Sequence, residues 1–307
     1  MMTREEWLEE RRHSIGGSDA AAIAGMTEWA TPYTVWADKT GRVPDKEDNE
    51  AMRQGRDLEA YVAAHFTEAT GKKVHVHRDL IKNPAYPFAH GTIDRKVTGE
   101  KAGLECKTVS ALGLKRFKGG DYPANYYAQC VHYLAVTGWE RWYLAVCVLG
   151  KDFMIFTIDR DEDEIKALMD LEKRFWETYV LQDSPPPVDG LEPTGDTIRT
   201  IYAESNADGR VDLFGREKML LEYMDTENAI RILQKDNEER RQQLMEDLGE
   251  NERGDSGSYT VTWKHQTRTS FDSKAFMADH DDIDFEPYIK RSDFRVFRVK
   301  ENKANDK

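Results

Sequence analysis

The chain has 307 residues and a formal net charge of −13 at pH 7, with 39% hydrophobic and 33% charged residues. This length allows one large domain or two of ordinary size, and the composition lies within the globular range. There is no run of about 18 apolar residues, so we expect no membrane span, and the acidic balance argues against a protein that coats nucleic acid through charge alone.

The first 183 residues are predicted to form a mixed α/β domain, because helical and strand periodicities alternate along them. Thr3 and Glu6 form a capping-box pattern for the first helix, and Ser18 or Asp19 is expected to cap the second. Helices are expected at 3–12, 14–25, 31–41, 49–71, 125–138 and 161–182, and strands at 72–83, 88–97, 103–109, 141–150 and 151–160.

Three consecutive prolines in SPPPVDG, at 184–190, end this pattern with a stiff extended connector. We therefore predict a first domain at 1–183, a linker at 184–212 and a C-terminal part at 213–307. The C-terminal part is expected to hold one long helix, roughly 213–248, as a helical arm, and a small β element that includes a short strand at 294–300.

Polar side chains interrupt the apolar strands of the α/β part. Asp94 lies in the strand at 88–97, and alternation places Glu105 and Lys107 on one face of the strand at 103–109. If these strands are neighbours, the two carboxylates converge on a site that suits Mg²⁺ or Mn²⁺, and Glu59 on the preceding helix can extend it. Lys107 can then orient or deprotonate a water that attacks phosphorus. Taken alone, the spacing also allows an ordinary surface ion pair.

Five stretches in chain order resemble the YqaJ-like viral recombinase family, which includes lambda-type exonuclease, within the PD-(D/E)xK nuclease superfamily. They are WLEERRHSIGGSD at 7–19, GRDLE at 55–59, HGTID at 90–94, GLECK at 103–107 and YYAQCVHYL at 126–134. The resemblance implies an α/β fold with a restriction-endonuclease-like core, in which helices flank a central mixed sheet, extended by the C-terminal long helix and short strands. The chain departs from the superfamily pattern at Ile93, which stands where the name has proline, and lambda-type exonuclease itself lacks the tail.

The resemblance also implies roles for the polar residues. Asp94, Glu105 and the backbone carbonyl of Cys106 would bind the metal, Glu59 would complete the metal and catalytic group, and Lys107 would orient the attacking water. A second group would bind the terminal 5′-phosphate of the digested strand, and it consists of Arg11, Ser18, Thr92 and Gln129. Guanidinium, hydroxyl and amide groups are suitable donors to a phosphate.

The function implied by the resemblance is a Mg²⁺-dependent 5′-to-3′ exonuclease of phage or prophage origin, in which Mn²⁺ can replace Mg²⁺. It would digest double-stranded DNA ends and supply single strands for recombination by annealing. The implied partners are a single-strand annealing recombinase and further copies of the chain in a ring-shaped trimer. Two alternatives stay open: a structure-specific endonuclease or RecB-like nuclease, and a DNA-binding scaffold without catalysis.

The N-terminal stretch MMTREEWLEERRHS is charged and has no apolar segment, so we expect no secretory signal. The three cysteines, Cys106, Cys130 and Cys147, have no CxxC spacing. This pattern indicates a reducing compartment with neither a disulfide framework nor a zinc site. Together with the phage or prophage origin that the resemblance implies, this leads us to expect a cytoplasmic protein of a bacterial host cell.

Overall fold

The computed structural model of the chain describes residues 9–45, 48–77 and 79–302, so the capping residues expected at Thr3 and Glu6 lie outside the described residues. The chain divides into two compact units, Met1–Tyr202 and Ala203–Lys307. The interval expected as a linker, 184–212, contains helix α7 (Glu192–Ile201). This helix packs on α3 (Pro32–Lys39), and the buried hydroxyls of Thr31 and Thr194 lie 2.8 Å apart.

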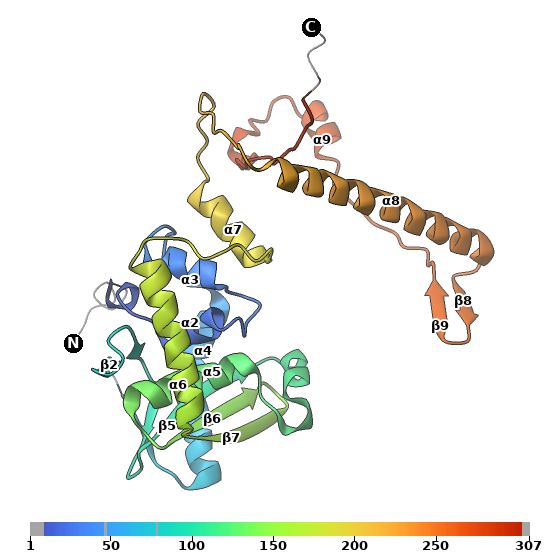
Figure 1. Cartoon of the computed structure of the whole chain (residues 1–307). Helices are drawn as coiled ribbons and strands as arrows, with labels where there is room; N and C mark the ends of the chain where they lie inside the picture. The colour runs from blue at the N-terminus through green and yellow to red at the C-terminus, as the bar shows by residue number, and fades with distance from the viewer. Residues whose placement is uncertain (1–8, 46–47, 78, 303–307) are drawn as a thin grey trace. The chain divides into compact units, whose positions relative to one another are not determined.

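The first unit is built on a five-stranded sheet with the order β1-β4-β5-β6-β7, of which Figure 1 labels β5, β6 and β7. Its strands are β1 (Val74–Val76), β4 (Arg95–Val97), β5 (Ala102–Val109), β6 (Arg141–Val148) and β7 (Asp152–Asp159). β5 and β6 are parallel, and the other neighbours are antiparallel. Parallel neighbours need a crossover connection, which helix α5 (Ala124–Thr137) supplies. The predicted central mixed sheet is thus confirmed.

The side chains of β6 alternate between two apolar layers, one on each face of the sheet. Trp142 and Leu144 pack in the layer that also contains residues of α2, α3, α5 and α6, whereas Tyr143 and Ala145 pack with α4. The bounds of these further helices are α2 (Gly17–Ile23), α4 (Glu50–Thr70) and α6 (Glu162–Phe175), which continues as a π-helical turn (Trp176–Val180). On β5, Leu104 belongs to the α4 layer. Neighbouring side chains of a strand point to opposite faces, so Gly103 and Glu105 lie on the face of the sheet that α5 covers.

Two of the expected strands are each interrupted. The segment 72–83 contains β1 and the short β2 (Ile81–Lys82), and the segment 88–97 contains β3 (His90–Gly91) and β4. β2 pairs with β3, whereas β4 pairs with β1 and β5, so the chain changes from one sheet to the other after β3. The sequence suggested that Asp94 lies within a strand. In the structure it lies instead in the bend before β4.

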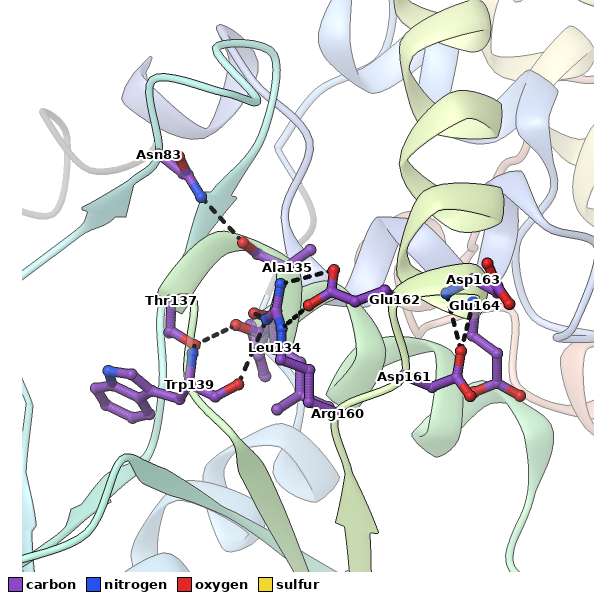
Figure 2. Close-up of polar contacts among 11 residues, drawn as sticks. Asn83, Leu134, Ala135, Thr137, Trp139, Arg160, Asp161, Glu162, Asp163 and Glu164 are labelled. Carbon is purple, nitrogen blue, oxygen red and sulfur yellow. Dashed lines mark hydrogen bonds and ion pairs between the residues drawn. The ribbon is translucent and has the colours of Figure 1, made fainter.

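The C-terminal end of α5 is tied to neighbouring segments by polar contacts (Figure 2). Gly138 follows the helix in a left-handed conformation with φ 66°, as expected for a helix closed by glycine. Arg160 Nη1 donates to the carbonyl of Leu134 at 2.5 Å, and Asn83 Nδ2 donates to the carbonyl of Ala135 at 3.1 Å. These donors satisfy carbonyls of the last turn and hold α5 in place.

A fully buried ion pair joins α5 to α6. His132 Nδ1 lies 2.9 Å from Glu172 Oε1, and His132 Nε2 lies 2.8 Å from the carbonyl oxygen of His90. Both ring nitrogens thus face acceptors, which favours the protonated imidazole. Burial by itself would lower the pKa of His132, but the carboxylate of Glu172 outweighs it and raises the pKa.

Replacing Glu172 by Gln is expected to lower the free energy of unfolding by about 3–5 kcal/mol, because the buried His132 loses its counter-ion. Urea unfolding at neutral pH measures the loss. The matched control is Glu177→Gln, because Glu177 forms an exposed pair with Lys173 at 3.9 Å. This variant should stay within about 0.5 kcal/mol of the wild type. Equal losses in the two variants would contradict the assignment.

The same pair predicts a pH dependence of stability. Because the folded pKa of His132 is raised, the contribution of its protonated form is complete below the ordinary histidine pKa of about 6.5 and is lost as pH rises through the folded value. Urea midpoints should therefore fall from about pH 6 to about pH 9 more steeply in the wild type than in Glu172→Gln.

The second unit contains helix α8 (Glu217–Leu248), which confirms the long helix expected in this part. It also contains the hairpin of β8 (Arg253–Ser256) and β9 (Tyr259–Thr262), helix α9 (Ser273–Asp279) and a 3₁₀ turn (Glu286–Tyr288). The prediction of a strand at 294–300 was wrong. This segment pairs with no strand among the described residues, and Phe294 and Phe297 are exposed. Across the described ranges, no helix has both the length and the apolar character that crossing a membrane requires.

Candidate active site

Glu105 and Lys107 form a largely buried ion pair on β5. Lys107 Nζ lies 2.6 Å from Glu105 Oε1, and the two side chains are 23% and 3% exposed. Their strand is paired with the buried β6, with Glu105 opposite Leu144 and Lys107 opposite Val146. A carboxylate in such a position costs free energy unless its charge is compensated, so this pair differs from an ordinary surface ion pair.

Asp94 reaches the same strand from the bend before β4. Its Oδ2 accepts a hydrogen bond of 2.8 Å from the backbone N–H of Cys106, the residue between Glu105 and Lys107. Burial and then the negative charge of Glu105 raise the pKa of Asp94 well above its ordinary value, although Lys107 and the Cys106 N–H oppose this. The structure therefore brings Asp94 and Glu105 close enough to repel each other.

Helix α5 holds the ammonium of Lys107 from one side. Lys107 Nζ donates to Gln129 Oε1 at 3.0 Å and lies 5.2 Å from the ring centroid of Tyr126. Gln129 Nε2 in turn donates to the hydroxyl of Tyr133 at 3.0 Å. These three α5 residues share one helix face because they are spaced three and four positions apart.

The protonation state of Lys107 follows from its neighbours. Burial by itself would lower the pKa of Lys107, but the carboxylates of Glu105 and Asp94 outweigh it and raise the pKa. Lys107 therefore stays charged at neutral and moderately alkaline pH, so it can donate to a water or to a phosphate oxygen.

Glu59 contacts the site through Arg95, a residue that the sequence motifs did not indicate. Its carboxylate pairs with Arg95 Nη1, which also donates to the backbone carbonyl of Asp94 at 2.7 Å. The negative charge of Glu59 contributes to the raised pKa of Asp94, so the two carboxylates are near each other. The signal for Arg95 was its place directly after Asp94, where an arginine within a buried strand needs an acidic partner.

A divalent cation would complete this group of charges. Glu105 Oε2 is buried and has no hydrogen-bond partner within the described part of the chain. Burial raises the pKa of the Cys106 thiol, which makes the thiol a poor ligand and leaves the Cys106 carbonyl as the donor from this residue. In the described ranges, no three His, Cys, Asp or Glu side chains form a metal-binding group. The donors that fit such an ion are the carboxylates of Asp94 and Glu105 and the backbone carbonyl of Cys106, an all-oxygen set that suits a hard divalent cation.

Comparison with known proteins identifies the family. The model of the YqaJ-like viral recombinase domain matches residues 6–140. The uncharacterized protein YqaJ of Bacillus subtilis (strain 168) is 36% identical over 304 residues, which span 98% of this chain and 95% of that protein. The chain belongs to the YqaJ-like viral recombinase family.

A solved structure shares the fold of more than half of this chain. LHK-Exo, an alkaline exonuclease from Laribacter hongkongensis, matches with a TM-score of 0.50 and 22% sequence identity, over 58% of this chain and 93% of that chain. This likeness confirms the predicted α/β fold, in which helices flank a central mixed sheet. The residues expected to bind metal and phosphate all lie inside the stretch that the family model matches.

Two of the four residues expected at the 5′-phosphate of a YqaJ-like enzyme lie together. Arg11 and Ser18 line a cleft of about 2150 Å³ in the first unit, and Ser18 is exposed to it. Gln129 contacts Lys107 instead, and Thr92 is exposed two residues before Asp94. Neither Thr92 nor Gln129 lines this cleft.

Lys39 holds the backbone of Arg11, the arginine that lines the cleft. The sequence patterns did not indicate this buried lysine. Lys39 Nζ lies 2.6 Å from Asp19 Oδ2 and donates to the backbone carbonyl of Arg11 at 2.8 Å. Arg11 Nη2 lies 4.0 Å from Asp19 Oδ1. Burial would raise the pKa of Asp19, but Lys39 and Arg11 outweigh it and lower the pKa. The expectation that Ser18 or Asp19 caps α2 was wrong, because the helix begins at Gly17 and its N-cap is Gly16. Asp19 lies in the first turn, where its carboxylate accepts a hydrogen bond from the Gly16 N–H.

Proposed function

We propose that this chain is a metal-dependent 5′-to-3′ exonuclease that digests one strand from the ends of double-stranded DNA, with Mg²⁺ as its ion and Mn²⁺ as a substitute. The family and the shared fold support a nuclease that acts on DNA. The observation that carries the finer proposal is the buried group of Asp94, Glu105 and Lys107 with its unsatisfied carboxylate oxygen. Burying these charges costs folding free energy, but the same group suits metal-dependent hydrolysis of a phosphodiester.

The metal would be held by Asp94, Glu105 and the carbonyl of Cys106. When bound, such an ion polarises a phosphate oxygen and lowers the pKa of a coordinated water. Lys107 stays charged, so its part is to donate a hydrogen bond to the attacking water or to a phosphate oxygen, and not to remove a proton.

Other side chains position these groups. Gln129 and Tyr126 orient the ammonium of Lys107. Glu59 acts through Arg95, which holds the backbone of Asp94 at the bend. Glu59 is thus proposed to support the metal group from outside it, and direct ligation by Glu59 is not required.

The direct test uses linear duplexes that differ only in a 5′-phosphate or a 5′-hydroxyl, incubated with Mg²⁺ or EDTA. The proposal predicts digestion from 5′ ends that needs the ion and is faster on phosphorylated ends. A structure-specific endonuclease or RecB-like nuclease would treat both ends alike. A protein that binds the duplex but never cuts it would instead be a DNA-binding scaffold.

Arg11→Ala is expected to reduce kcat/KM on phosphorylated ends by about 10- to 100-fold, with little change on hydroxyl ends, since a charge-assisted hydrogen bond contributes about 1.5–3 kcal/mol. The ratio of the two kcat/KM values is the measurement. The control is Arg12→Ala, because Arg12 lines the same cleft but pairs with Asp45 at 2.7 Å. Loss of the preference in Arg12→Ala, with Arg11→Ala unchanged, would move the role to Arg12.

We also propose a biological setting for this activity. The single strands would pass to an annealing recombinase in the cytoplasm of a bacterium that carries the phage or prophage gene. A ring-shaped homotrimer around the duplex would let a chain of net charge −13 retain DNA without broad electrostatic attraction. Sedimentation equilibrium should then report about three times the monomer mass of 35.4 kDa.

A further inference from the structure

The cleft that contains Arg11 and Ser18 also exposes a large aromatic side chain that the site described above does not use. Trp29 lies in the loop between α2 and α3 and is 59% exposed at the cleft. Tryptophan is seldom left this exposed, and its ring gains free energy when an apolar or aromatic surface covers it.

Arg116 lies against this ring. Its Cζ is 4.8 Å from the ring centroid of Trp29 and 5.8 Å from that of Tyr126, so the guanidinium contacts two aromatic rings. Arg116 Nη2 also donates to Asn125 Oδ1 at 3.3 Å. Among the described residues no carboxylate pairs with Arg116, so its charge can serve an anion. We call Trp29, Arg116 and Tyr126 the aromatic column.

The aromatic column borders both parts of the site. Trp29 and Arg116 line the same cleft as Arg11. At the other end, the ring of Tyr126 lies 5.2 Å from Lys107 Nζ. A strand end bound between the cleft and the ammonium of Lys107 would therefore meet the column.

We propose that Trp29 and Arg116 form a stacking platform for the nucleobase at the DNA strand end, with the guanidinium also available to its phosphate. This inference rests on the proposed exonuclease function. Nucleic acid presents π-faces and anionic groups at regular spacing, which matches an exposed indole beside a guanidinium that pairs with no carboxylate of the described residues. Because every base has a π-face, the platform detects the presence of a base and not its identity.

The test compares phosphorylated duplexes whose first 5′ nucleotide is either normal or abasic. For the wild type, removing the base should lower kcat/KM for release of the first nucleotide by about 5- to 100-fold, the range expected for one stacked base. Trp29→Ala should lower kcat/KM on the normal end by a similar factor and show no further loss on the abasic end. Trp29→Phe should keep most of the difference between the ends, and Arg116→Ala should reduce it.

Two matched controls lie in the same segment as Arg116. Lys115→Ala removes an exposed positive charge, and Leu112→Ala removes an exposed apolar side chain, both outside the aromatic column. Both should keep the wild-type ratio between normal and abasic ends. A wild-type ratio in Trp29→Ala, or equal loss of the ratio in both controls, would overturn the inference.

A binding measurement separates this inference from the proposed function. Fluorescence anisotropy of a labelled duplex in EDTA reports binding without hydrolysis, and the wild type should bind the normal end more tightly than the abasic end. This preference should disappear in Trp29→Ala. Preference without any metal-dependent digestion would overturn the exonuclease proposal and leave the platform. Digestion by the wild type without any preference would overturn the platform alone.

Discussion

Asp94→Asn is expected to lower kcat/KM for digestion of linear duplex DNA by about 10³-fold or more, since metal-assisted catalysis contributes several kcal/mol. The same change is expected to raise the melting temperature of the protein in EDTA. Burial and the charge of Glu105 oppose ionisation of Asp94, so a neutral amide relieves repulsion. The amide oxygen can still accept the hydrogen bond from the Cys106 N–H.

The sign of the stability effect follows from the raised pKa of Asp94. Between the ordinary pKa of an aspartate, about 3.9, and its higher folded value, the folded protein binds more protons than the unfolded chain. The stability of the wild type in EDTA therefore falls as pH rises through this window, whereas Asp94→Asn should lack this loss. Adding Mg²⁺ should raise the melting temperature of the wild type but not that of the variant.

Thermal unfolding and initial digestion rates measure the two effects on the same samples. The control is Asp152→Asn, since Asp152 is exposed at the start of β7 and, within the described ranges, accepts only from the adjacent backbone N–H of Phe153. It should change neither quantity. An Asp94→Asn variant that digests DNA at the wild-type rate would remove Asp94 from the catalytic group.

Lys107→Met is expected to abolish digestion to a similar extent but to change stability in the opposite direction. Methionine keeps much of the volume and removes the charge that compensates Glu105 at 2.6 Å. Breaking a buried pair by removing one partner costs about 3–5 kcal/mol, so the variant should unfold at lower urea concentration in EDTA. A divalent ion should restore part of this loss, because it supplies positive charge to the same carboxylates.

Two further variants, one at Lys107 and one at the exposed Lys166, separate the effect on catalysis from the effect on folding. Lys107→Arg keeps the charge, so it should retain most of the stability while losing activity through altered donor geometry. Lys166→Met removes one partner of an exposed pair with Asp170 and should leave both stability and activity unchanged. If Lys107→Met and Lys166→Met had equal activity, Lys107 would have no role in hydrolysis.

The parts of the site that the sequence predicted depend on local periodicity. Strand alternation alone places Glu105 and Lys107 on one face of β5, where the structure has their ion pair. The five stretches that resemble the YqaJ-like family then indicated that these residues come together with Asp94 and Glu59 in one site. This reasoning is sufficient for β5, β6, β7 and α5, whose patterns are long and regular.

The parts that it missed depend on contacts between distant segments. Arg95 and Glu59 are 36 positions apart, and His132 and Glu172 are 40 apart, so no local pattern joins them. The bend at Asp94 arises because β3 and β4 pair with strands of different sheets. Likewise, 294–300 is rich in the aromatic and β-branched residues that favour strands, but it has no neighbouring strand among the described residues to pair with.

Calorimetric titration of Mg²⁺ and Mn²⁺ into the wild type, Asp94→Asn and Glu105→Gln tests most directly whether these two carboxylates share a cation. We expect the wild type to bind the ion and either substitution to remove or strongly weaken this binding, while circular dichroism shows both variants folded. Equal binding by all three proteins, or no binding by the wild type, would contradict this expectation.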